Sequence, residues 1–150
     1  CDFYLGSDSG IYNVANSFEK KISFVNFPSM SLLSRYHSDK NLPCSIKLIK
    51  NRKDKKLLTF EEMLRNKFDN LLDYEELYRS GYELISNTDQ EIMELAMEIL
   101  GDYQIDEMEK KYLTDKFSSI FNRYNPNTSN TQSVPRIGIS FLKKYKYLLD

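Results

Sequence analysis

Apolar and polar positions follow a distinct order over residues 3–28. Phe3–Leu5 is a short aromatic and aliphatic run, typical of a buried strand, and residues 6–10 are all small or capping types. A second apolar run occupies residues 22–25. Between the two runs, apolar residues recur at helical spacing: Ile11, Val14, Ala15 and Phe18. Strand, turn, helix and strand in this order predict a βαβ unit with two neighbouring parallel strands.

The pattern of the remaining chain is mostly helical. Thr59 with Glu62 fits a capping box and predicts a helix from there to about residue 70. Thr88 with Glu91 fits a second capping box, ahead of an apolar stripe that ends at Gly101. The other expected elements are a short helical turn within 29–36, a loop over the basic stretch 47–56, a helix at 74–79 closed by Gly81, a strand at 82–85, a helix at 106–123, an exposed loop at 125–135, and a terminal helix at 136–149 with Phe141 and Leu142 facing inward. We therefore expect an α/β fold, with a partial parallel sheet of few strands flanked by several helices.

Length and charge narrow the class of protein. The chain has 150 residues, which is the size of one domain, and its 41% apolar content is that of an ordinary globular protein. Lys and Arg number 21 against 22 Asp and Glu, and this net charge of −1 argues against a nucleic-acid-binding domain. No apolar stretch approaches the ~18–20 residues that span a bilayer, and no basic region leads into an apolar run as in a signal peptide.

The cysteines and the first residues add an expectation about context. Cys1 and Cys44 are too few for a disulfide framework and too isolated for a zinc site, so a reducing cytosol is the default. The chain passes from Cys1 directly into the first strand, without the disordered lead-in that termini usually have. We therefore expect residues 1–150 to be a single domain and a fragment, the carboxyl-terminal part of a longer protein.

The segment with the clearest chemical potential is Gly6-Ser7-Asp8-Ser9-Gly10, between the first strand and the first helix. Backbone N–H groups at the start of a helix have no intrahelical partner, and small residues let a phosphate approach them closely. Ligands of open α/β sheets also bind outside the carboxyl ends of the strands. One interpretation is a phosphate or diphosphate site, with hydroxyl donors from Ser7 and Ser9. The other is structural: Asp8 or Ser9 caps the helix and the glycines form the turn.

Four sets of motifs occur in order along the chain. Residues 1–11 with 18–28 carry a strand, Ser-Asp-Ser-Gly, a helix and a strand that ends Val-Asn-Phe-Pro. The others are Leu-Thr-Phe-Glu-Glu-Met in residues 57–64, Asn-Thr-Asp-Gln-Glu-Ile in 86–92 and Arg-Ile-Gly-Ile-Ser-Phe-Leu in 136–142. Together these motifs resemble a bacterial family of glycosyltransferases with the two-domain, Rossmann-like GT-B fold. The resemblance covers most of the chain apart from residues 100–130, and Lys21 stands where the family usually has Pro.

The resemblance implies a set of site residues. Ser7, Asp8, Ser9 and Gly10 would line the site for the donor diphosphate, with Asn26 as a neighbour because it ends the adjacent strand. Thr59, Glu61 and Glu62 are candidates to approach the donor ribose or sugar, although a capping box also explains Thr59 and Glu62. Thr88 and Glu91 are explained by their capping box alone.

The other polar and aromatic residues are expected to have structural or surface roles. His37, the single histidine, has no acid partner near it in sequence, and Cys44 has no accompanying histidine motif, so neither is expected to act in catalysis. The basic residues of 47–56 could meet an anionic donor or acceptor, but a solvated loop is the favoured account. The tyrosines at helical spacing are expected in the core and at its rim.

The expectation for function is the nucleotide-sugar-binding part of a glycosyltransferase of polysaccharide biosynthesis. The resemblance implies a nucleotide-sugar donor as substrate, a glycan or lipid-linked acceptor, no metal and no other cofactor, and a catalytic base outside this chain. It also implies a cytoplasmic location, with peripheral membrane association as an option. Two alternatives stay open: a phosphate- or dinucleotide-binding module of another enzyme, and a non-catalytic Rossmann-like interaction domain.

Overall fold

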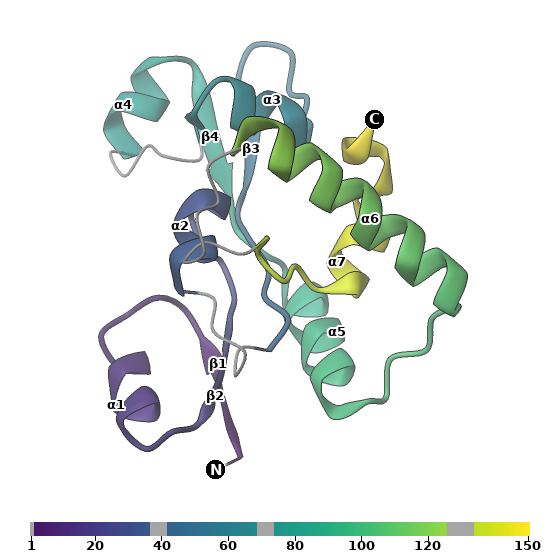
Figure 1. Cartoon of the computed structure of the whole chain (residues 1–150). Coiled ribbons are helices and arrows are strands. Elements are labelled where there is room, and N and C mark those ends of the chain that lie inside the picture. Colours follow the sequence, from purple (N-terminus) through teal and green to yellow (C-terminus); the bar gives the residue numbers. More distant parts are fainter. Residues whose placement is uncertain (1, 37–41, 69–73, 126–133) are drawn as a thin grey trace.

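The computed structural model describes residues 2–36, 42–68, 74–125 and 134–150. Within these residues, helices surround two small sheets of two strands each (Figure 1). In chain order the elements are β1 (Phe3–Gly6), α1 (Tyr12–Ser17), β2 (Lys21–Phe24), α2 (Met30–Tyr36), β3 (Leu48–Asn51), α3 (Phe60–Arg65), α4 (Tyr74–Arg79), β4 (Tyr82–Ile85), α5 (Asp89–Leu100), α6 (Glu107–Tyr124), α7 (Ile139–Lys144) and the 3-10 helix η2 (Lys146–Leu149).

The predicted βαβ unit is confirmed. β1 and β2 pair in parallel, with Phe3 opposite Lys21 and Gly6 opposite Phe24. α1 connects the two strands and packs on them, and the ring of Tyr12 meets the ring of Phe24 edge-on at 5.4 Å between centroids. The chain is thus α/β, with a small parallel sheet flanked by helices.

Two further extended segments continue the parallel arrangement beyond β2. Phe27 and Ile46 form a parallel bridge, which places the segment 42–47 beside the end of β2. Cys44 and Ile137 form the next parallel bridge, which adds a short stretch ahead of α7. Because all these segments run in the same direction, their carboxyl ends lie along one edge.

The basic stretch 47–56 corrects one expectation. Its first half is not a loop but β3, which pairs antiparallel with β4 from Leu48 opposite Ile85 to Asn51 opposite Tyr82. β4 therefore belongs to a separate antiparallel pair and is not a third strand of the parallel sheet. Buried Leu48 and Ile49 drive this pairing, and the lysine charges on either side hide the strand pattern in the sequence.

Both predicted capping boxes are present and set the helix starts. The Thr59 and Thr88 side chains accept the backbone N–H groups of Glu62 and Glu91, and each glutamate accepts the threonine N–H in return. α5 ends at Gly101, whose φ of 87° is the left-handed conformation that glycine favours. α3 ends at Arg65, earlier than expected.

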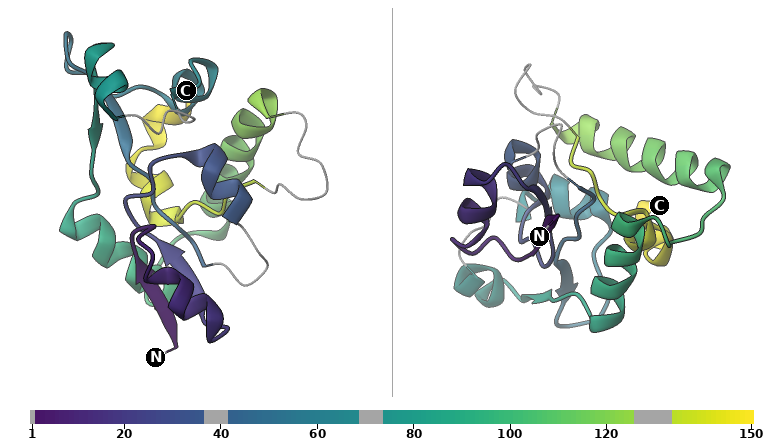
Figure 2. Two further views of the ribbon diagram at one scale, coloured as in Figure 1. Left: turned by 90° about the vertical axis from the view of Figure 1, so that its left-hand side faces the viewer. Right: turned by 90° about the horizontal axis from the view of Figure 1, so that it is seen from below.

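The core lies where α6, α7 and η2 meet α3 and the antiparallel sheet (Figure 2). Its large buried rings include Phe60, Phe117 and Phe121. Phe141 and Leu142 are buried as predicted, but the expected helix 136–149 is divided. Residues 136–138 are extended because they pair with Cys44, and the α-helix ends at Lys144. Most of the expected loop 125–135 lies outside the described residues.

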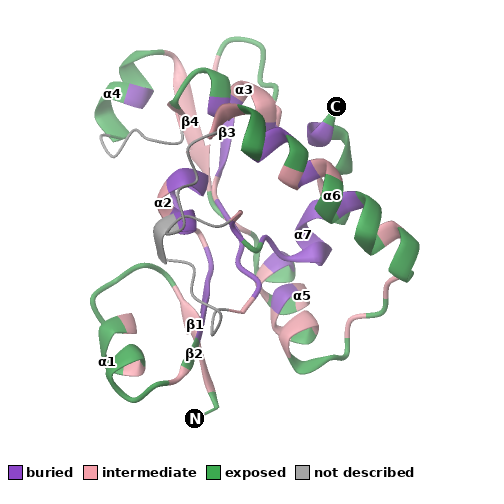
Figure 3. Cartoon of the chain, viewed as in Figure 1, coloured by how far each residue is buried: buried purple, intermediate pink, exposed green. Residues whose placement is uncertain are grey.

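α1 departs from the pattern that predicts it. The helix forms, yet none of its residues is buried, and Figure 3 shows it exposed at one end of the molecule. Ile11, Val14 and Phe18 all face solvent, and Phe18 is 71% exposed. The apolar stripe therefore predicts the helix correctly, but this helix contributes no buried residue to the core.

Candidate functional site

The bend between β1 and α1 is open to solvent. Ser7, Asp8, Ser9 and Gly10 are all exposed. The Ser9 and Gly10 carbonyls accept the N–H groups of Tyr12 and Asn13 at 3.1 and 3.2 Å, and the Tyr4 hydroxyl donates to the Ser7 carbonyl at 2.9 Å. These bonds fix the bend while leaving its outer surface uncovered.

The backbone amides of the bend are available to a ligand. Within the part of the chain that the structure describes, the N–H groups of residues 8–11 make no hydrogen bond. Consecutive unbonded amides at a turn form a concave site for an anion. Small side chains at Ser9 and Gly10 keep the approach open, and a Cβ atom added at Gly10 would have no atom within 4 Å.

Side-chain capping does not account for the bend. The N-cap residue of α1 is Ile11, and no side chain caps this helix, so neither Asp8 nor Ser9 has that structural role. α1 has only 6 residues, which limits the contribution of its dipole to anion binding. The chemistry available at this place is therefore that of main-chain N–H donors, two serine hydroxyls and the exposed Asp8 carboxylate.

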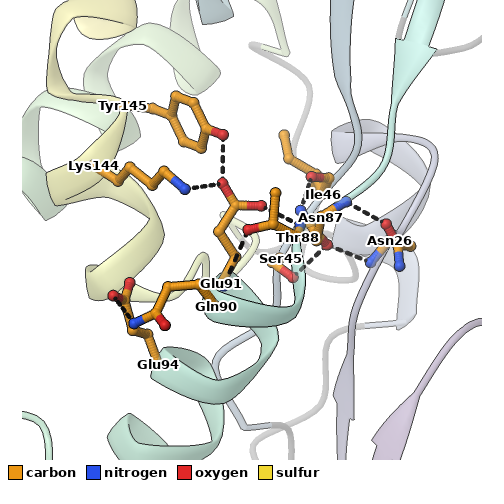
Figure 4. A network of polar contacts seen from close by, with 10 residues as sticks. All are labelled: Asn26, Ser45, Ile46, Asn87, Thr88, Gln90, Glu91, Glu94, Lys144 and Tyr145. Carbon is orange, nitrogen blue, oxygen red and sulfur yellow. Dashed lines mark hydrogen bonds and ion pairs between the residues drawn. The ribbon is translucent and has the colours of Figure 1, made fainter.

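Asn26 lies two residues beyond the end of β2 at the same edge of the sheet, since Gly6 lies opposite Phe24. Its φ of 55° is left-handed, and its polar groups bind Asn87 in a reciprocal pair (Figure 4). The Asn26 N–H donates to Asn87 Oδ1, and the Asn87 N–H donates to Asn26 Oδ1, both at 2.6 Å. Asn26 thus lies near the bend along the sheet edge, and its Oδ1 is already hydrogen-bonded to the Asn87 N–H.

Asn87 is the residue that sequence reasoning did not single out. Its Oδ1 also accepts the Ser45 hydroxyl at 2.7 Å, and its Nδ2 donates to the Ile46 carbonyl at 2.9 Å (Figure 4). One side chain therefore joins the end of β2, the extended segment after it and the start of α5. The available signal was its place directly between a strand and a capped helix.

The residues expected near the ribose or sugar lie elsewhere. Thr59 and Glu62 form the α3 capping box, at the opposite end of the molecule from the bend (Figures 1 and 2). Glu61 accepts the Tyr124 hydroxyl at 2.6 Å and Arg123 Nη1 at 3.1 Å. The Tyr124 bond, with help from the Arg123 charge, outweighs desolvation and lowers the Glu61 pKa. The structure does not bring these three residues together with the bend.

The remaining candidates for reactive side chains are Cys44, His37 and groups of possible metal ligands. Burial raises the pKa of Cys44 to about 11, against the smaller effects of its Phe24 and Ser23 bonds, so the thiol stays protonated. In the described ranges, no group of three or more His, Cys, Asp or Glu side chains could hold a metal ion. His37 lies outside the described residues.

Comparisons with known proteins identified no relative of this chain. No helix in the described part of the chain is long and apolar enough to cross a membrane. No family model, curated protein or solved structure matches this chain.

Proposed function

We propose that this chain is the nucleotide-sugar-binding part of a glycosyltransferase with a GT-B-type fold. The observation that carries the proposal is the exposed bend at the end of β1, whose backbone amides at residues 8–11 lack partners among the described residues. A diphosphate is the group that such amides suit best, because its oxygens accept several N–H donors at once. The resemblance of the Ser7–Gly10 motif to that family supplies the class of donor.

In this proposal the bend holds the donor through main-chain dipoles and not through a metal. The amides are fixed before binding by the bonds of Ser9 and Gly10 to α1, so little ordering is needed when the diphosphate arrives. Ser7 and Ser9 add hydroxyl donors, and Asn26 lies next along the edge. A glycan or lipid-linked acceptor would approach from outside this chain, which also leaves the catalytic base outside it. The proposed setting is the cytoplasm, free or at the membrane surface.

Replacing Ile11 with proline tests the role of a single amide. Ile11 has φ −66° and ψ −25°, a backbone that proline adopts. It is the second residue of the turn from Gly10 to Asn13, where proline is favoured, and the third residue of the turn from Ser9 to Tyr12, where proline restricts the residue before it. The substitution Ile11→Pro therefore removes one N–H without strain at position 11, and Gly10, which has no Cβ, takes up the restriction. Calorimetric titration with UDP and GDP should show affinity weakened by about ten- to a hundredfold, as expected for a lost hydrogen bond to a charged group of about 1.5–3 kcal/mol.

Matched variants separate the amide from the side chain. Ile11→Ala removes the exposed side chain but keeps the N–H, and we expect it to bind as the parent does. Ser9→Asp places a carboxylate in the bend and should abolish binding, whereas Asn16→Asp adds the same charge near the end of α1 and should not. Equal affinity in all four variants would remove the proposal, and so would an absence of binding by the parent protein.

The exposed apolar side of α1 favours a second candidate, an interaction domain without catalysis. Ile11, Val14 and Phe18 form a patch beside the bend of a kind that partner proteins cover. Under this alternative, Phe18→Ser would abolish association with a partner while UDP and GDP show no binding. Titration with NAD and inorganic phosphate distinguishes a dinucleotide or phosphate module, which would bind these ligands better than UDP.

A further inference from the structure

A cluster of tyrosines and cations covers the outer side of α4 and β4. We name it the α4 surface and define it by Tyr74, Tyr78, Tyr82, Lys47 and Arg52. Tyr74 and Tyr78 are 50% and 53% exposed, one helical turn apart on α4. α4 itself is mostly open to solvent (Figure 3). Half-exposed tyrosine rings present apolar area to water, and such rings are enriched at protein interfaces.

The cations of this surface are fixed in place against the rings. The Arg52 guanidinium lies 3.7 Å from the centroid of the Tyr78 ring, and Arg52 Nη1 donates to the Tyr78 carbonyl at 3.4 Å. Its own N–H donates to the Gly81 carbonyl at 2.9 Å, which anchors the backbone. Lys47 Nζ lies 5.5 Å from the Tyr74 centroid. These positions reduce the entropy that the two charges would lose on meeting a partner.

Two hollows adjoin Tyr74 and Tyr78. The first has a volume of about 390 Å³ and is lined by these two tyrosines and the Glu75–Arg79 pair. On the other side of the same two tyrosines is a second hollow of about 290 Å³, with Leu77 and Leu84 in its lining and Lys47 at its margin. An apolar side chain that enters the second hollow would lie against rings and leucines and beside a positive charge.

The charges around the two hollows indicate the charge that a partner would carry. The stretch 47–56 carries six Lys or Arg residues against one Asp, in a chain whose net charge is −1. The acids at the rim are already paired, Glu83 with Lys50 at 3.2 Å and Glu75 with Arg79 at 2.9 Å. Lys47 and Arg52 make no ion pair with any described residue, so their charges are available to an acidic partner.

We infer that the α4 surface binds an acidic protein segment that carries one apolar anchor residue. The anchor enters the second hollow, against Tyr74, Tyr78 and Leu77, and flanking carboxylates meet Lys47 and Arg52. A protein segment is favoured over a nucleic acid because the chain has a net charge of −1, without the basic excess of a nucleic-acid-binding domain. Aromatic and Arg residues at the centre with a mixed polar rim are the composition of a protein interface.

Selection of random displayed peptides on the intact protein tests the inference. We expect the enriched peptides to share Asp or Glu residues around one aromatic or aliphatic position. An enriched peptide, labelled and titrated by fluorescence anisotropy, should bind at least about tenfold more weakly to Tyr78→Ser and to Lys47→Glu. Its affinity should also fall as salt rises, since the attraction acts between exposed charges. Lys47→Glu reverses the charge of a half-buried side chain beside Tyr74 and removes no core residue, so it keeps the test decisive if Tyr78→Ser does not fold.

The chain offers a matched control on α6. Tyr112 is 49% exposed and has Lys116 Nζ 5.8 Å from its ring centroid, but it does not line either hollow of the α4 surface. Tyr112→Ser should leave peptide affinity unchanged. The inference is wrong if no peptide is enriched, if the enriched peptides lack acidic residues, or if the control weakens binding as much as Tyr78→Ser. It is equally wrong if heparin or single-stranded RNA, and no peptide, binds in a Tyr78-dependent way. None of these results bears on UDP or GDP binding at the distant bend.

Discussion

Glu91 joins two helices that are far apart in sequence. Its Oε2 accepts the Thr88 N–H at 2.7 Å in the capping box of α5. Its Oε1 lies 2.8 Å from Lys144 Nζ and also accepts the Tyr145 hydroxyl (Figure 4). Glu91 is 4% exposed, and Thr88, Lys144 and Tyr145 all donate to its carboxylate. Local capping and long-range packing thus depend on one side chain at the junction of α5 and α7.

The pH dependence of stability should reveal this arrangement. Burial would raise the Glu91 pKa, but the bonds from Lys144, Tyr145 and Thr88 outweigh it and hold the pKa below its ordinary value of 4.5. A lowered pKa in the folded state stabilises the fold fully above that ordinary value, and the stabilisation is lost as the pH falls through the lower folded value. Urea unfolding from pH 7 to pH 3 should therefore show the free energy of unfolding decline only at the acid end.

Glu91→Gln checks the assignment, since it removes the charge but keeps the shape. We expect it to lower the free energy of unfolding by about 1–3 kcal/mol at pH 7 and by less at pH 3. Glu75→Gln breaks an exposed pair with Arg79 and should cost at most about 1 kcal/mol. A Glu91→Gln penalty that stays constant with pH would show that the charge has no part in it.

At the scale of elements, local signals predicted the helix ends that are set by caps, but not the end of α3 at Arg65. The boxes at Thr59 and Thr88 and the left-handed Gly101 are set by neighbouring residues, so the sequence contains all the information needed. β3 was missed because its pairing partner β4 lies over thirty positions later, and Lys47 and Lys50 made the segment resemble a loop. The division between α7 and its preceding stretch likewise depends on the distant Cys44.

The packing of α5 on α7 gives a prediction at this scale. Gly138 has φ −57° and ψ 136°, a backbone that alanine adopts freely, so a substitution is limited only by space. A Cβ there would lie 2.6 Å from Leu95 Cδ1 and 3.3 Å from Glu98 Oε2, and Leu95 is completely buried. Gly138→Ala should lower the free energy of unfolding by about 1–3 kcal/mol, measured in urea.

Gly10 provides the matched glycine. A Cβ there meets nothing within 4 Å, and its φ is not left-handed. Gly10→Ala should therefore change the free energy of unfolding by no more than about 0.5 kcal/mol. Equal effects at Gly10 and Gly138 would mean that α5 moves away from α7 without cost, contrary to the close packing described.

At the scale of the whole molecule, the spacing of apolar residues predicted where helices lie in the sequence, but not which elements pack against them. The stripe of α1 and the stripe of α6 are similar in sequence, yet α6 is covered by α3, α7 and η2 while α1 lies at one end. The same limit applies to the candidate site. The bend Ser7–Gly10 is local and was predicted as a turn, whereas the Asn26–Asn87 pair requires knowing that positions 61 apart meet. Thr59, Glu61 and Glu62 were grouped with the bend by resemblance, and the fold sets them apart.

Truncating one aromatic residue from each stripe measures this difference. Phe117 on α6 is 2% exposed and lies edge-on to Phe60 at 5.6 Å between centroids. Phe117→Ala should lower the free energy of unfolding by about 3–5 kcal/mol, because it leaves a cavity that the surrounding rings cannot fill. Phe18→Ala removes the same group from solvent-facing α1, and its effect should stay within about 0.5 kcal/mol. A cost at Phe18 comparable to that at Phe117 would show that α1 is covered in solution, since a ring that already faces water loses no burial when it is removed.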